Sequence, residues 1–64
     1  MEAYQLRLVH EQDALDEKTK ALYSFLASKQ FDSLDAENRF LLKQQYYAMQ
    51  VYSGILLQRI VLFK

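Results

Sequence analysis

The residues best suited to chemistry form one stripe in the first half of the chain. Tyr4, Glu11 and Lys18 recur every seven residues, and Arg7 lies beside Tyr4 on the same side of a helix. A tyrosine offers a ring face for stacking, and a lysine offers a positive charge for a phosphate. Tyr4 and Lys18 are 14 residues apart, about 21 Å along one helix. One small ligand could reach both only if an antiparallel second chain brought them together, in a polar pocket between helices.

Glu11 and Lys18 have a second interpretation that needs no ligand. They lie beside the stripe of Leu8, Leu15 and Leu22, at what would be the second seam position of a heptad, where leucine is expected. Their aliphatic stems could cover the core while their charged heads reach water. Interhelical salt bridges that set the register would give the same pattern. The pattern alone leaves the pocket and the boundary interpretations open.

Tyr52 and Arg59 share a stripe in the second half of the chain. A tyrosine at helical spacing commonly packs in the core with its hydroxyl at the rim. Arg59 near a helix C-terminus interacts favourably with the helix dipole. An arginine repeated around a symmetry axis would instead form a strong phosphate site. Both interpretations remain open for Arg59.

Catalytic patterns are missing from the sequence. No nucleophile has an adjacent base, there is no glycine-rich phosphate loop, and no paired carboxylates stand out from an ordinary helix surface. The chain has no cysteine and one histidine, His10, so neither a thiolate metal site nor a zinc site is expected. We therefore expect a protein that is not an enzyme and uses no metal or cofactor.

The elements that would position these residues are two long helices. Zero prolines and one glycine leave little to interrupt a helix. The leucine stripe predicts an amphipathic first helix over residues 2–28, and cap and turn formers follow over residues 28–35. Ser33 or Asp35 is the expected N-cap of a second helix that reaches about residue 62. Phe31 and Leu34 are expected to plug the closed end. The predicted fold is all-α, a single antiparallel helical hairpin over residues 1–64.

The second helix has more apolar surface than one partner helix can cover. Two neighbouring series recur every seven residues: Leu42, Met49, Leu56 and Phe63, and Leu41, Ala48, Ile55 and Leu62. A chain of 64 residues that is 52% hydrophobic has little interior of its own, and it lacks disulfides and metals as reinforcement. We therefore expect the chain to assemble with copies of itself. Gly54 inside this pattern indicates either close approach of another helix or tolerance of a weak position.

Charge and hydropathy exclude two kinds of partner. Eight basic and eight acidic residues give zero formal net charge, so no overall field would recruit DNA. No apolar run approaches the ~18 residues of a membrane span, and no signal peptide pattern opens the chain. A cytoplasmic protein that binds neither DNA nor membrane is expected.

Several short elements follow one another along nearly the whole chain: Tyr4-Gln5-x-Arg7-Leu8-Val9-x-Glu11, Leu15-Asp16-x-Lys18, Leu22-x-x-Phe25-Leu26, Phe31-x-Ser33-Leu34, Leu41-Leu42, Gln45, Met49, Tyr52, Ile55-Leu56 and Arg59-Ile60 before Phe63. Each element alone is weak. The ordered set resembles the small phage anti-CBASS proteins that act as cyclic-oligonucleotide sponges.

The resemblance implies a homohexamer of helical hairpins in the host cytoplasm. Such proteins bind cyclic dinucleotides between protomers, and some also hold cyclic trinucleotides near a threefold axis, without cleaving them. By resemblance, Tyr4 would stack on a base, Lys18 would contact a phosphate and Arg59 would belong to the trinucleotide site. Arg7 and Glu11, on the face of Tyr4, complete the candidate set. The alternative function is a structural or protein-interaction module that oligomerises and binds a phage or host protein.

Overall fold

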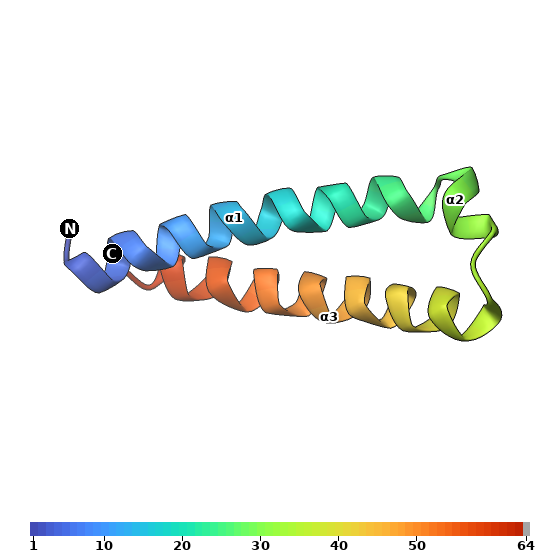
Figure 1. Cartoon of the computed structure of the whole chain (residues 1–64). Coiled ribbons are helices and arrows are strands. Elements are labelled where there is room, and N and C mark those ends of the chain that lie inside the picture. The colour runs from blue at the N-terminus through green and yellow to red at the C-terminus, as the bar shows by residue number, and fades with distance from the viewer. Residues whose placement is uncertain (64) are drawn as a thin grey trace.

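The protein is a hairpin of two long antiparallel helices. The computed structural model describes residues 1–63 and contains α1 (Ala3–Leu26), the short α2 (Lys29–Asp32) and α3 (Ala36–Val61). α1 and α3 lie side by side, α2 lies at the closed end, and both ends of the chain lie at the open end (Figure 1). The prediction of an all-α hairpin is confirmed. We find no helix among the described residues that is long and apolar enough to cross a membrane.

Local capping explains where the helices begin. The Glu2 backbone N–H donates to the Gln5 side chain at 2.8 Å at the start of α1. Ser28 caps α2, because its hydroxyl accepts the Phe31 backbone N–H at 3.2 Å. Asp35, rather than the alternative Ser33, is the N-cap residue of α3. Its carboxylate accepts the Asn38 side-chain N–H at 2.6 Å, and this hydrogen bond lowers the pKa of Asp35.

The two helices meet along one narrow seam whose residues alternate at spacings of three and four, the pattern of a coiled coil. On α1 the seam contains Gln5, Leu8, Gln12, Leu15, Thr19, Leu22 and Leu26. On α3 and just beyond it, the seam contains Arg39, Leu42, Tyr46, Met49, Ser53, Leu56, Ile60 and Phe63. All of these residues are buried or half-buried.

The expectation that Glu11 and Lys18 take the second seam position is wrong, and Tyr4, which shares their spacing, lies outside the seam too. All three are exposed, and the residue that follows each of them in the sequence lies in the seam instead. The physical reason is visible at Gln12, which is 7% exposed. Its amide is satisfied by Ser53 across the seam, so a polar residue can occupy a position where the pattern calls for leucine.

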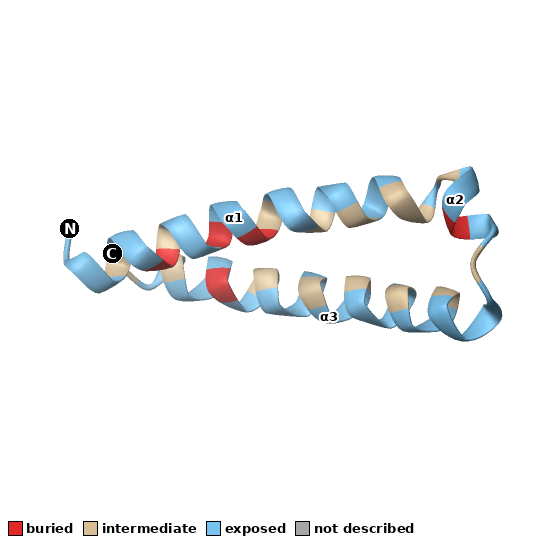
Figure 2. Cartoon of the chain, viewed as in Figure 1, coloured by how far each residue is buried: buried red, intermediate tan, exposed pale blue. Residues whose placement is uncertain are grey.

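The core is concentrated near the open end of the hairpin. Leu8, Leu15 and Leu56 form the buried cluster, and Leu56 is fully buried. Met49, Ile60 and Phe63 pack against this cluster. A separate buried residue, Phe31 on α2, closes the other end as expected, while Leu34 is half-buried (Figure 2).

The side of α3 that faces away from α1 is uncovered. We define this outer face by its residues: Phe40, Leu41, Gln44, Tyr47, Ala48, Val51, Gly54, Ile55, Gln58, Val61 and Leu62. All of these except the half-buried Gly54 are exposed. The series of Leu42, Met49, Leu56 and Phe63 therefore faces α1, whereas the series of Leu41, Ala48, Ile55 and Leu62 is exposed. A Cβ added at Gly54 would meet nothing within 4 Å, so no close approach inside the hairpin explains this glycine.

Candidate functional site

The predicted binding residues lie on one flank of the seam. On α1, the residues that directly precede seam positions 5, 12 and 19 are Tyr4, Glu11 and Lys18. On α3, the residues that directly precede seam positions 53 and 60 are Tyr52 and Arg59. In an antiparallel helix pair, such equivalent positions project on the same side of the seam. We call these five residues the Tyr4 flank. Arg7, also exposed, lies at its outer margin, within one turn of Tyr4.

The ring of Tyr4 packs against another aromatic ring yet is open to solvent. It packs against the ring of Phe63, with centroids 6.1 Å apart and planes at 87°. Such an edge-on contact favours one orientation of the ring. Tyr4 is nevertheless 55% exposed. The flank therefore offers a positioned aromatic surface on which a planar group could stack.

The charges of the Tyr4 flank are exposed as well. Glu11, Lys18 and Arg59 are all exposed, and the ion pair found within residues 1–63 is Lys20 with Asp16, 3.0 Å apart on α1. Among the described residues, Glu11 and Lys18 therefore form no salt bridge to α3 within one hairpin. Their solvent-exposed charged groups agree with the interpretation of these two residues as boundary residues of the core. Lys18 and Tyr4 remain separated along α1 by the distance expected from the sequence, about 21 Å. One chain alone does not bring them to one small ligand.

The opposite flank contains an open groove that sequence reasoning did not find. Its volume is about 610 Å³. The lining residues come from both helices: Asp16, Thr19, Lys20, Tyr23, Ser24, Tyr46, Gln50, Ser53, Gly54 and Leu57. The seven-residue spacing of Asp16 and Tyr23 was the signal available in the sequence, because these residues directly follow the seam leucines Leu15 and Leu22.

Tyrosines form one wall of this groove. The rings of Tyr23 on α1 and Tyr46 on α3 have centroids 5.8 Å apart, and the ring of Tyr47 is 5.9 Å from that of Tyr46. Gln50 donates a side-chain N–H to the Tyr46 hydroxyl at 2.9 Å. A smaller hollow of about 300 Å³ continues beside these tyrosines, and Lys43 also lines it. Aromatic side chains therefore line both flanks of the hairpin.

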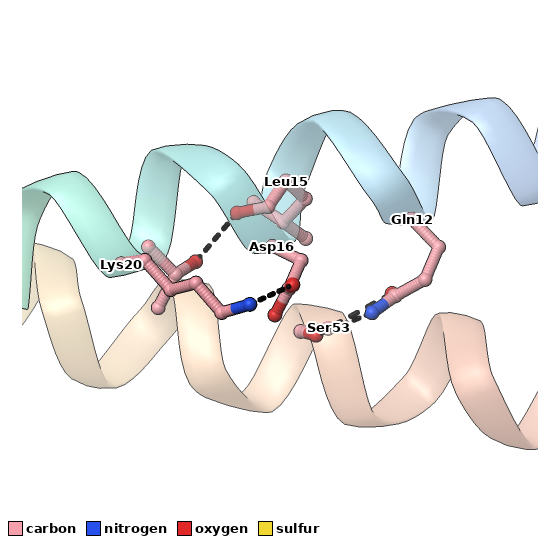
Figure 3. Close-up of polar contacts among 6 residues, drawn as sticks. Gln12, Leu15, Asp16, Lys20 and Ser53 are labelled. Carbon is pink, nitrogen blue, oxygen red and sulfur yellow. Dashed lines mark hydrogen bonds and ion pairs between the residues drawn. The ribbon is translucent and has the colours of Figure 1, made fainter.

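The polar pair Gln12–Ser53 links the two helices beside this groove. The Gln12 side-chain N–H donates to the Ser53 hydroxyl at 2.9 Å, and that hydroxyl also lies 3.4 Å from Oε1 of the Gln12 side chain (Figure 3). Nearby, the Thr19 hydroxyl donates to the Leu15 carbonyl at 2.7 Å, so it is satisfied within α1. Among residues 1–63, no three histidine or carboxylate side chains are grouped closely enough to hold a metal ion.

Fold and site together define a small helical hairpin with exposed aromatic and charged flanks. The family model described as Sequestin matches residues 2–62. A relative from Enterobacteria phage T4, the "Uncharacterized 7.5 kDa protein in denB-rIIB intergenic region", is 41% identical over 64 residues, which are all of this chain and all of that protein. No solved structure matches. The chain belongs to the Sequestin family, and it is similar over its whole length to a small phage protein.

Proposed function

We propose that this protein is a phage sponge that binds cyclic dinucleotides, and cyclic trinucleotides at a separate site, without cleaving them. Sequestration in the host cytoplasm would lower the free concentration of the second messenger and prevent activation of the CBASS effector. The observation that carries the proposal is the environment of the Tyr4 ring. This ring packs against Phe63, is exposed to solvent, and lies on the same flank as exposed cations.

Each residue of the candidate set has a role that fits its chemistry. Tyr4 stacks on a base, a contact worth about 1–3 kcal/mol. Lys18 from a neighbouring chain contacts a phosphate, because within one chain it is too far from Tyr4. Arg7 extends the positive charge beside the ring, and Glu11 accepts hydrogen bonds from amino or hydroxyl groups of the ligand. Arg59, on the α3 side of this flank, contacts the phosphates of a cyclic trinucleotide.

Family membership supports a sequestering role only through its description, Sequestin, which is compatible with sequestration. The small size of the chain agrees with a stoichiometric binder that is not an enzyme. A homo-oligomer, a hexamer in this proposal, would place Lys18 of one chain next to Tyr4 of another.

A second candidate function is a helical module that binds a phage or host protein. The observation that favours it is the uncovered outer face of α3, where apolar side chains of the kind found in protein interfaces are exposed. This function predicts no affinity for cyclic nucleotides.

Matched pairs of substitutions on the two flanks test the sponge. Tyr4→Ala should weaken cyclic dinucleotide binding about tenfold or more, the equivalent of one lost stacking contact. Tyr23→Ala removes an equally exposed ring from the opposite flank and should leave the affinity unchanged. Lys18→Glu should weaken binding, whereas Lys20→Glu, two residues away on the other side of α1, should have a much smaller effect.

The same titrations show how the proposal would fail. If Tyr23→Ala abolishes binding while Tyr4→Ala does not, the groove is the binding site and the assignment of Tyr4 is wrong. After denaturation of the complex, the nucleotide should be recovered chemically unchanged. A linearised product would identify a nuclease instead of a sponge.

A further inference from the structure

The outer face of α3 is the largest uncovered apolar surface of the described chain. It carries no charged residue between Phe40 and Leu62, although α1 exposes charged residues such as Asp13 and Glu17 on its own outward side. Seven large apolar side chains on this face are at least half exposed, from 50% at Ile55 to 79% at Leu62. A helix with apolar residues on two opposite sides is typical of one that packs against partners on both sides.

The size of this surface matches a protein–protein contact. The exposed parts of the seven side chains amount to roughly 800 Å², about the area that each partner contributes to a stable interface. The absence of charge indicates a partner surface that is also uncharged. The outer face of a second copy has this property.

The sequence of the outer face indicates how two copies would meet. Its middle line consists of Gln44, Val51 and Gln58, spaced by seven residues. If two α3 helices cross in antiparallel orientation at Val51, Val51 meets its own copy and Gln44 meets Gln58 of the other chain. Two carboxamides can satisfy each other with reciprocal hydrogen bonds. Each of these polar residues therefore has a hydrogen-bonding partner across the contact.

Next to Val51, the residues on either side of this line are complementary in size. In the same register, Tyr47 lies opposite Gly54 of the other chain, and Ala48 lies opposite Ile55. In these two central layers each large side chain faces a small one, whereas in the outer layers Phe40 lies opposite Val61 and Leu41 lies opposite Leu62. An added Cβ at Gly54 meets nothing within 4 Å in the single chain. A parallel register would place two Tyr47 rings together and two glycines together, which would overpack one layer and leave a void in another.

We infer that the outer face of α3 is a twofold interface in which α3 of a second copy packs antiparallel, centred on Val51. The contact is isologous, because both chains contribute the same residues. α3 then becomes the inner helix of the assembly, and α1 with its charged surface remains outside. This inference needs no nucleotide, so it stands or falls independently of the sponge.

Cysteine cross-linking tests both the surface and the register, because the chain contains no cysteine of its own. A disulfide requires Cα atoms about 4.4–6.8 Å apart. Helix axes about 8–10 Å apart bring residues on the contact line into this range. Val51→Cys should therefore form a covalent dimer in nearly complete yield under mild oxidation, and not in urea. Gln44→Cys alone and Gln58→Cys alone should stay uncross-linked, whereas the two variants refolded together should cross-link.

Glu17→Cys on the outward side of α1 is the matched control and should stay uncross-linked at the same protein concentration. Circular dichroism verifies that each variant retains its helices. If each of the three single variants on the middle line cross-links on its own, the contact is parallel and the inferred register is wrong. Failure of both Val51→Cys and the mixture of Gln44→Cys with Gln58→Cys to cross-link would overturn the interface itself.

Discussion

The polar pair in the seam gives a prediction whose magnitude follows from the structure. Gln12 is 7% exposed, and Ser53 is its hydrogen-bonding partner across the seam. Ser53→Ala would leave the buried Gln12 amide without that partner. A buried polar group that loses its hydrogen bond costs about 1–3 kcal/mol. We therefore expect Ser53→Ala to lower the free energy of unfolding by about that amount.

Removing both partners should behave differently. The double variant Gln12→Leu with Ser53→Ala leaves no buried amide to satisfy and adds apolar contacts to the seam. Replacing a polar pair with apolar groups of similar shape is often neutral or stabilising. The double variant should therefore be at least as stable as the original chain, with a coupling of about 1–2 kcal/mol between the two positions.

Urea unfolding followed by far-ultraviolet circular dichroism measures these differences, at one protein concentration because the stability of an oligomer depends on it. Ser24→Ala, an exposed serine in the groove, is the matched control and should change stability by less than about 0.5 kcal/mol. If Ser53→Ala lowers the free energy of unfolding by no more than the control does, or if the effects of the two substitutions simply add in the double variant, the hydrogen bond has no structural role.

Three further outcomes follow from burial and hydrogen bonding. Leu56→Ala, at a fully buried position, should cost about 2–5 kcal/mol in urea unfolding, whereas the exposed Glu17→Ala should cost almost nothing. Phe31→Ala should lower the thermal midpoint by opening the closed end, with a cost of about 3–5 kcal/mol; an unchanged midpoint would show that α2 does not contribute to stability. Because the Asn38 hydrogen bond lowers the pKa of Asp35, its stabilising effect is present above the usual titration range of aspartate and is lost as the pH falls through the lowered pKa. An NMR titration should show the Asp35 midpoint rising in Asn38→Ala, and an unchanged midpoint would exclude this cause.

The fold was largely predictable because leucine spacing and cap residues act locally. Leu8, Leu15 and Leu22 identified one line of the seam, and the polar residues between positions 28 and 35 identified the turn. The second line of seam residues on α1, which includes Gln12, was not predictable, because Gln12 depends on a partner 41 residues away in the sequence. Nothing in the local sequence shows that Gln12 will meet Ser53 and be satisfied there.

The candidate site was predictable in part. Seven-residue spacing grouped Tyr4, Glu11 and Lys18, and the structure places them on one flank, although outside the seam instead of within it. The groove on the other flank was missed because its walls come from both helices. Tyr23 meets Tyr46 only after the hairpin has closed, so their proximity depends on the register of α1 against α3. Local patterns show which residues share a helix face, but not which faces meet.

The most direct test of the proposed function is calorimetric titration of the purified protein with a panel of cyclic di- and trinucleotides, together with light scattering for particle mass. We expect tight binding of less than one cyclic nucleotide per chain on a particle of several chains, because each pocket needs residues from more than one chain. No binding across the panel by a folded oligomer would contradict the sponge, and it would make a protein partner the leading candidate.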